Sequence, residues 1–81
     1  FRRVLFRSGH SREVAEPHQR GTRENLIVTA GRLELTIGAD RHELEEGDAI
    51  VFGADVPHSY ENPRGEECVM YLVMTYEGRG A

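Results

Sequence analysis

The segment RLELTI, residues 32–37, constrains the fold more than any other part of this sequence. It has a glycine on each side, and its residues alternate strictly between apolar and polar side chains. Because side chains alternate between the two faces of a β-strand, Leu33, Leu35 and Ile37 are predicted to share one face. The segment therefore predicts a half-buried strand with one face on a core and one face in water.

Further segments have the same β character. Residues 24–30 form a β-branched run that ends at Gly31, and residues 41–45 and 49–52 form two short strands. Residues 68–76 are apolar on both faces, which predicts a central strand of a sheet. The turn segments GAD, EGD and NPRGEE separate these strands. Short strands at such spacing, without sustained helical periodicity, predict an all-β sandwich or barrel.

Length and charge limit what such a fold can do. The chain has 81 residues, enough for one small domain with a modest core, so we expect a homodimer or a missing partner domain to supplement that core. Acidic residues number 14 against 10 basic ones, which argues against direct contact with nucleic acid. The longest apolar runs are too short to cross a bilayer. The single cysteine, Cys68, forms no internal disulfide, which indicates a reducing compartment such as the cytoplasm.

The first eight residues, FRRVLFRS, raise a separate question of origin. Back-translated, they resemble the end of a common sequencing adapter read in frame. We therefore expect residues 1–8 to be an artefact on a truncated gene, residues 9–81 to form a single domain, and the native N-terminus to lie upstream. The alternative is a genuine strand, because Val4 and Phe6 alternate with Leu5 and Arg7.

Three residues form the set most suited to chemistry. His18 follows a proline at an expected strand end, Glu24 opens the next strand, and His58 lies at the start of another. Strand ends can converge in a small barrel, and two imidazoles with one carboxylate suit a divalent transition metal such as zinc, iron, nickel or manganese. The structural alternative is that His58 forms a hydrogen bond to the backbone of a turn and that Glu24 lies on the solvent-exposed face of a strand.

Two stretches of the chain resemble the two conserved motifs of the cupin superfamily, the small jelly-roll barrels or double-stranded β-helices. The first motif runs His, one residue, His, three or four residues, Glu, six residues, Gly. In PHQRGTRENLIVTAGRLEL, this spacing is matched by His18, Glu24 and Gly31. Arg20 stands where the second histidine of the motif would be.

The second motif is matched in GDAIVFGADVPHSYEN. Gly47, His58 and Asn62 fit its spacing, whereas Gly53 replaces the expected proline and Asp55 the expected glycine. Independently of the motif, Asn62 is expected to fix the following turn through its side chain. Together the two motifs imply a cupin barrel that is truncated at its N-terminus.

A closer resemblance lies within that superfamily. The runs GT-x-E, V-x-x-GRLEL, HELEEGDAI-x-F and ADVPHSYEN are similar to the C-terminal cupin domain of bacterial transcriptional regulators. Those regulators carry an N-terminal helix-turn-helix of the phage-repressor type. The resemblance implies a small-molecule sensor whose DNA-binding part is missing here. The expected ligand-binding residues, at the mouth of the barrel, are His18, Arg20, Glu24, His58 and Tyr60.

Two other functions remain open at this point. The first is a small cupin metalloenzyme, a dioxygenase or isomerase, in which His18, Glu24 and His58 hold the metal. The second is a stand-alone storage or binding module without a metal. Arg20 bears on the choice, because its guanidinium can bind a carboxylate or phosphate of a ligand. The structural alternative for Arg20 is a solvated surface side chain.

Overall fold

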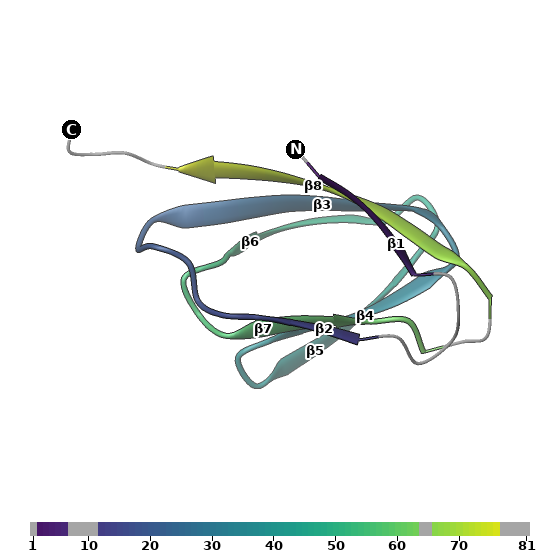
Figure 1. Cartoon of the computed structure of the whole chain (residues 1–81), viewed down its shortest axis with the longest axis horizontal. Helices are drawn as coiled ribbons and strands as arrows, with labels where there is room; N and C mark the ends of the chain where they lie inside the picture. Colours follow the sequence, from purple (N-terminus) through teal and green to yellow (C-terminus); the bar gives the residue numbers. More distant parts are fainter. Residues whose placement is uncertain (1, 7–11, 64–65, 77–81) are drawn as a thin grey trace.

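The protein is a sandwich of two antiparallel β-sheets, seen edge-on in Figure 1. A computed structural model describes residues 2–6, 12–63 and 66–76, and its strands within these ranges number eight. Their bounds are β1 (Arg2–Phe6), β2 (Arg12–Ala15), β3 (Thr22–Ala30), β4 (Arg32–Ile37), β5 (Asp40–Glu45), β6 (Ala49–Gly53), β7 (His58–Glu61) and β8 (Cys68–Tyr76). Within the described residues there is no helix long and apolar enough to cross a membrane.

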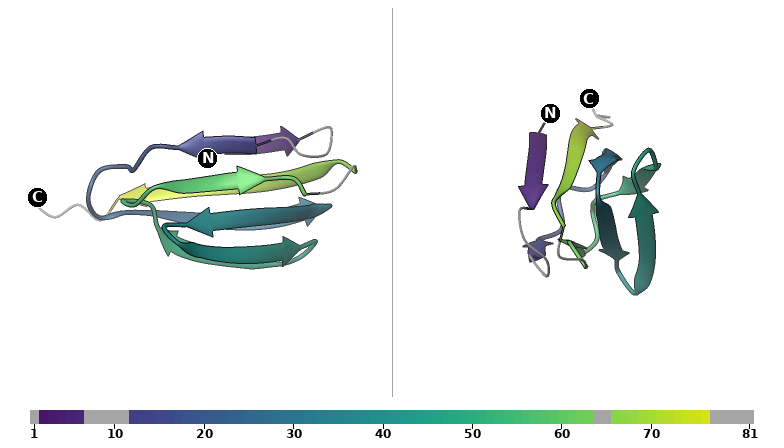
Figure 2. Two further views of the ribbon diagram at one scale, coloured as in Figure 1. Left: turned by 90° about the horizontal axis from the view of Figure 1, so that it is seen from below. Right: turned by 90° about the vertical axis from the view of Figure 1, so that its right-hand side faces the viewer.

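The two sheets contain four strands each, and every strand pair is antiparallel. The strand order is β1-β8-β3-β6 in one sheet and β2-β7-β4-β5 in the other (Figure 2). The chain crosses between the sheets at most of its connections, so strands that are neighbours in a sheet are often distant in sequence. This arrangement confirms the predicted all-β fold, and the place of β8 between β1 and β3 confirms its predicted central position.

The core lies between the sheets, where the inward side chains of both meet. Leu33 and Leu35 of β4 are completely buried, as their alternation predicts, and the outward residues of that strand are more exposed. The opposite sheet supplies Leu26 and Val28 of β3 and Met70 of β8 to the same core. Asn62 is fully buried, and its Nδ2 donates a hydrogen bond to the backbone oxygen of Glu66 at 2.7 Å. The predicted role of this side chain in the turn is therefore confirmed.

The outward face of the β4–β5 pair is charged. Arg32 forms ion pairs with Glu43 at 3.2 Å and with Glu45 at 2.9 Å, and Arg41 lies 3.8 Å from Glu34. Exposed pairs of this kind contribute little stability each, but they keep the surface hydrated. This side of the sandwich is therefore a water-facing surface, as the alternation of residues 32–37 predicts.

The described part of the N-terminal segment is a strand at the edge of its sheet. Within β1, Val4 lies opposite Met70 and Phe6 opposite Cys68 of β8, and both β1 side chains are buried. Residues 2–6 thus have the alternation that the alternative interpretation of this segment requires. An adapter origin of residues 1–8 stays a prediction, and sequencing of the native gene tests it.

Candidate functional site

Three different parts of the fold supply the side chains of the candidate site. Glu24 lies on the inward face of β3, His58 is the first residue of β7, and His18 lies in the connection between β2 and β3. The backbone N–H of His18 donates to the oxygen of Ala54 at 2.8 Å, which fixes this connection against the segment that leads into β7. The side chains of Glu24 and His58 are buried, whereas that of His18 is one-third exposed.

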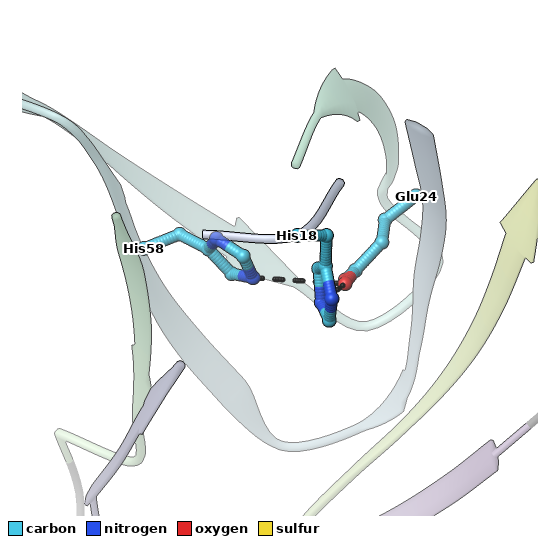
Figure 3. Close-up of side chains that lie close together, drawn as sticks. All are labelled: His18, Glu24 and His58. Atoms are coloured by element: carbon cyan, nitrogen blue, oxygen red, sulfur yellow. Dashed lines mark ion pairs between the residues drawn. The ribbon is translucent and has the colours of Figure 1, made fainter. Parts of the chain in front are cut away.

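Both imidazoles point at one carboxylate oxygen (Figure 3). Oε2 of Glu24 lies 3.2 Å from Nε2 of His18 and 3.6 Å from Nε2 of His58. One potential ligand atom from each of the three residues lies within 4.8 Å of the others. The structure therefore brings together the residues that the sequence singled out as metal ligands, in a group compact enough to share one ion.

The hydrogen bond of Nδ1 in His58 determines whether the other ring nitrogen, Nε2, has a lone pair available to a ligand. Nδ1 lies 2.8 Å from the backbone oxygen of Val56, and because a carbonyl only accepts, Nδ1 must carry the proton. Nε2 is buried and has no hydrogen-bond partner within the described part of the chain. In the neutral ring its lone pair faces the carboxylate of Glu24, and two electron-rich atoms do not attract. This arrangement suits a metal ion between the two groups.

The other oxygen of the carboxylate is occupied. The hydroxyl of Tyr60 donates to Oε1 of Glu24 at 2.6 Å, and both residues are buried. Burial raises the pKa of Tyr60 above its usual value, and the hydrogen bond to Glu24 and the charge of this carboxylate raise it further. Tyr60 therefore remains a protonated donor, which leaves Oε2 of Glu24 to face the two histidines.

The raised pKa of Tyr60 predicts a loss of stability in alkali. In the unfolded chain the phenol ionises near pH 10, whereas in the folded protein it keeps its proton to higher pH. Above about pH 10 the unfolded state therefore binds fewer protons, and the free energy of unfolding falls by up to about 1.4 kcal/mol per pH unit. Urea unfolding between pH 9 and 11 measures this slope. Tyr60→Phe should show a shallower slope, and an equal slope in both proteins would contradict the assignment.

A pocket of about 340 Å³ opens onto the site. It is lined by Arg2, Glu13, Ala15, His18, Glu24, Tyr60, Leu72 and Met74. Of the residues expected to bind a ligand, His18, Glu24 and Tyr60 line it, whereas His58 does not, although its Nε2 lies 3.6 Å from Oε2 of Glu24. A cavity of this size admits a small organic molecule.

Arg20 lies apart from this pocket. It is exposed, in the turn that precedes β3, and it is not among the pocket-lining residues. The turn passes through Gly21, whose φ is 87°, so the chain reverses just after Arg20. The reversal places Arg20 at the surface although the motif spacing aligns it with a histidine of the cupin pattern.

The sequence did not indicate several residues that line the pocket. Glu13 of β2, with Leu72 and Met74 of β8, contributes to its wall. Leu72 and Met74 face inward because they alternate with Tyr71 and Val73, a signal present in the sequence. What the sequence could not show is that this stretch of β8 lies beside Glu24, which the register of β3 against β8 establishes by placing Met74 opposite Glu24.

Known proteins share this fold and part of this sequence. The HTH-type transcriptional regulator SutR of Escherichia coli (strain K12) is 36% identical over 55 residues, which cover 68% of this chain and 30% of SutR. The crystal structure of the Cupin_2 domain of an XRE family transcriptional regulator from Enterobacter cloacae has a TM-score of 0.85 at 22% identity, covering 95% of this chain and 79% of that one. An HTH_3 family transcriptional regulator from Vibrio cholerae has a TM-score of 0.82 at 26% identity, covering 95% of this chain and 42% of that one.

The comparison with protein families identifies the domain itself. The model of the cupin domain family matches residues 2–74, a stretch that contains both motifs and all three residues of the candidate metal site. The chain spans less than half the length of SutR and of the Vibrio cholerae regulator. The chain belongs to the cupin domain family.

Proposed function

We propose that this cupin domain is the small-molecule sensor of a bacterial transcriptional regulator. Its support is the similarity to SutR and to the Vibrio cholerae protein, both named as helix-turn-helix regulators. In the proposed protein, a helix-turn-helix encoded upstream contacts DNA in the cytoplasm, and this domain does not. The formal charge of −4 is consistent with a domain that does not contact DNA, because a DNA-contacting surface needs clustered basic residues.

The observation that carries the proposal is the buried, unpartnered Nε2 of His58, which faces the carboxylate of Glu24 beside a pocket. Two imidazole nitrogens and one carboxylate oxygen fit zinc, iron, nickel or manganese, and His18, Glu24 and His58 would hold the ion. When bound, the metal supplies a Lewis acid to which an oxygen or nitrogen donor of a small molecule can attach. Tyr60 orients the carboxylate, and the apolar side chains of Leu72 and Met74 shield one side of the pocket.

Sensing requires binding but no chemical step. A ligand shifts a regulator between two arrangements when it binds one of them more tightly than the other. The relatives named above are regulators, so the comparisons favour sensing over the metalloenzyme alternative. Arg20 remains a proposed contact for a carboxylate or phosphate on the ligand, from its exposed position in the turn before β3.

Metal content tests the chemistry of the site. We expect purified protein, dialysed in turn against zinc, manganese, nickel and ferrous salts, to retain about one equivalent of at least one metal by elemental analysis. His58→Ala should lose that metal. His42→Ala is the matched control, because His42 is a half-buried histidine on β5 outside the cluster. Wild-type protein that retains none of the four metals would contradict the metal site.

Sequencing of the native locus tests the regulatory role separately. We expect the native locus to encode a helix-turn-helix upstream of this domain and in the same reading frame. A native gene whose coding region begins near residue 9 would contradict the regulator and favour a stand-alone module. This result is independent of the metal analysis, so either part of the proposal can fail alone.

A further inference from the structure

Two residues of β7 contribute to the candidate metal site in different ways. His58 and Tyr60 are two positions apart on this strand, so their side chains lie on the same face of it, and both are buried. Their rings lie edge to face, with centroids 5.6 Å apart. His58 offers its own nitrogen to the site, whereas Tyr60 reaches the site through the carboxylate of Glu24 on the opposite sheet. One strand therefore supplies a candidate ligand and also the hydrogen-bond donor to a second candidate ligand.

The two oxygens of the Glu24 carboxylate have different surroundings. Oε2 faces the imidazoles, 3.2 Å from Nε2 of His18 and 3.6 Å from Nε2 of His58. Two donors that each lie about 2.1 Å from one tetrahedral zinc ion are about 3.4 Å apart, so both distances suit ligands of a single ion. Oε1 instead accepts the hydrogen bond from the Tyr60 hydroxyl at 2.6 Å. A metal ion that bound both oxygens would have to compete with this hydroxyl for Oε1.

The backbone of Tyr60 is anchored on both sides. Its strand lies between β2 and β4, and in the register of the sheet Tyr60 is opposite Glu13 on one side and Leu35 on the other. The last torsion of a glutamate side chain has broad preferences, so without a partner the carboxylate of Glu24 could turn one oxygen or both toward an ion. A hydrogen bond from a donor that is itself fixed in the sheet removes this freedom.

We propose that Tyr60 is the positioning residue of the metal site, whose hydroxyl restricts Glu24 to coordination through Oε2 alone. This inference rests on the metal site proposed above and adds how its coordination is controlled. With one oxygen from Glu24 and one nitrogen from each histidine, the chain supplies three ligands. A zinc ion with four ligands then keeps one position for a small molecule, and the pocket lined by His18 and Glu24 lies beside it. A carboxylate bound through both oxygens would fill that position.

Zinc affinity tests whether Tyr60 acts on the site. Tyr60→Phe removes the hydroxyl and keeps the ring that lies against His58. Removal of a hydrogen bond to a metal ligand typically lowers metal affinity about ten- to hundredfold. In competition with a chromophoric chelator, we therefore expect this variant to bind zinc at least about tenfold more weakly than the wild type. Tyr71→Phe is the matched control, because Tyr71 lies on the outward side of β8, away from the site, and it should bind zinc like the wild type.

Infrared spectroscopy tests the coordination mode, which a purely structural role of Tyr60 would leave unchanged. The antisymmetric and symmetric stretching bands of a carboxylate are farther apart when one oxygen binds a metal than when both do. In difference spectra between zinc-loaded and metal-free protein, we expect widely separated bands in the wild type and in Tyr71→Phe. Their absence in Glu24→Gln would assign them to Glu24. In Tyr60→Phe the separation should narrow, because Oε1 is then free to bind the ion.

The possible results separate this inference from the metal site on which it rests. If Tyr60→Phe keeps the β-sheet spectrum in far-UV circular dichroism and an unchanged band separation, the positioning role is overturned whatever its zinc affinity, and the metal site stands. A narrow separation in the wild type overturns the role as well, and this measurement does not depend on the folding of any variant. Wild-type protein that binds no zinc would overturn zinc binding at the site and this inference together.

Discussion

Gly31→Ala is expected to lower the free energy of unfolding by about 2–5 kcal/mol, a large part of the stability of a domain of this size. Gly31 lies between β3 and β4 with φ of 78°, a conformation that costs an alanine about 1–2 kcal/mol. A Cβ at this position would lie 2.1 Å from the backbone oxygen of Glu67 and 2.9 Å from Cα of Cys68. Both atoms belong to the backbone at the start of β8, so no side-chain rotation relieves the overlap, and strain of about 1–3 kcal/mol or more is added. Domains of this size have only about 4–12 kcal/mol in total.

Gly38→Ala separates the two causes of this loss. Gly38 also has a left-handed backbone, with φ of 58°, but no atom lies within 4 Å of the position of a Cβ. It should therefore cost about 1–2 kcal/mol, the conformational part alone. Urea unfolding followed by circular dichroism measures both variants against the wild type. Equal losses at the two positions would contradict the close approach of Gly31 to Glu67.

Strands could be predicted from the sequence where their inward residues are apolar and the pattern of polarity is clear. Residues 32–37 and 68–76 were predicted with the bounds of β4 and β8 because each has an unambiguous apolar pattern. No strand was predicted at β2, although it pairs along its whole length with β7. In β2 the polarity is reversed: Val14 is 65% exposed and Glu13 lines the pocket. Alternation cannot reveal a strand whose inward residue is a charged group of the site.

The candidate site was predicted in its residue types but not in its contacts. Spacing within the motifs singled out His18, Glu24 and His58, which the structure brings together. The hydrogen bond from Tyr60 to Glu24 joins residues that are 36 positions apart and on opposite sheets. Such a contact depends on how the sheets are stacked, which no local pattern encodes. The same limitation applies to Arg20, whose side chain is directed by the turn at Gly21 and not by the motif.

Zinc is expected to stabilise the wild-type domain and to have no effect on Glu24→Gln. At a zinc concentration about 100–1,000 times the dissociation constant, binding to the folded state alone adds about 3–4 kcal/mol to the free energy of unfolding. For a domain of this size that corresponds to a rise in Tm of at least about 10 °C. Glutamine keeps the shape of Glu24 but lacks the negative charge that holds the ion between two histidines.

The expected stability of the metal-free variant makes this prediction selective. In Glu24→Gln, the amide oxygen can still accept the hydrogen bond from Tyr60, and the amide N–H can donate to the lone pair on Nε2 of His58. The variant should therefore unfold within about 1 kcal/mol of the metal-free wild type, so an absent response to zinc cannot be ascribed to a lost fold. Glu34→Gln is the control, because Glu34 is a half-buried carboxylate that lies outside the site and faces Arg41 on the outward side of β4. An equal rise in Tm with zinc in all three proteins would place the ion elsewhere, and no rise in any of them would contradict zinc binding at this site.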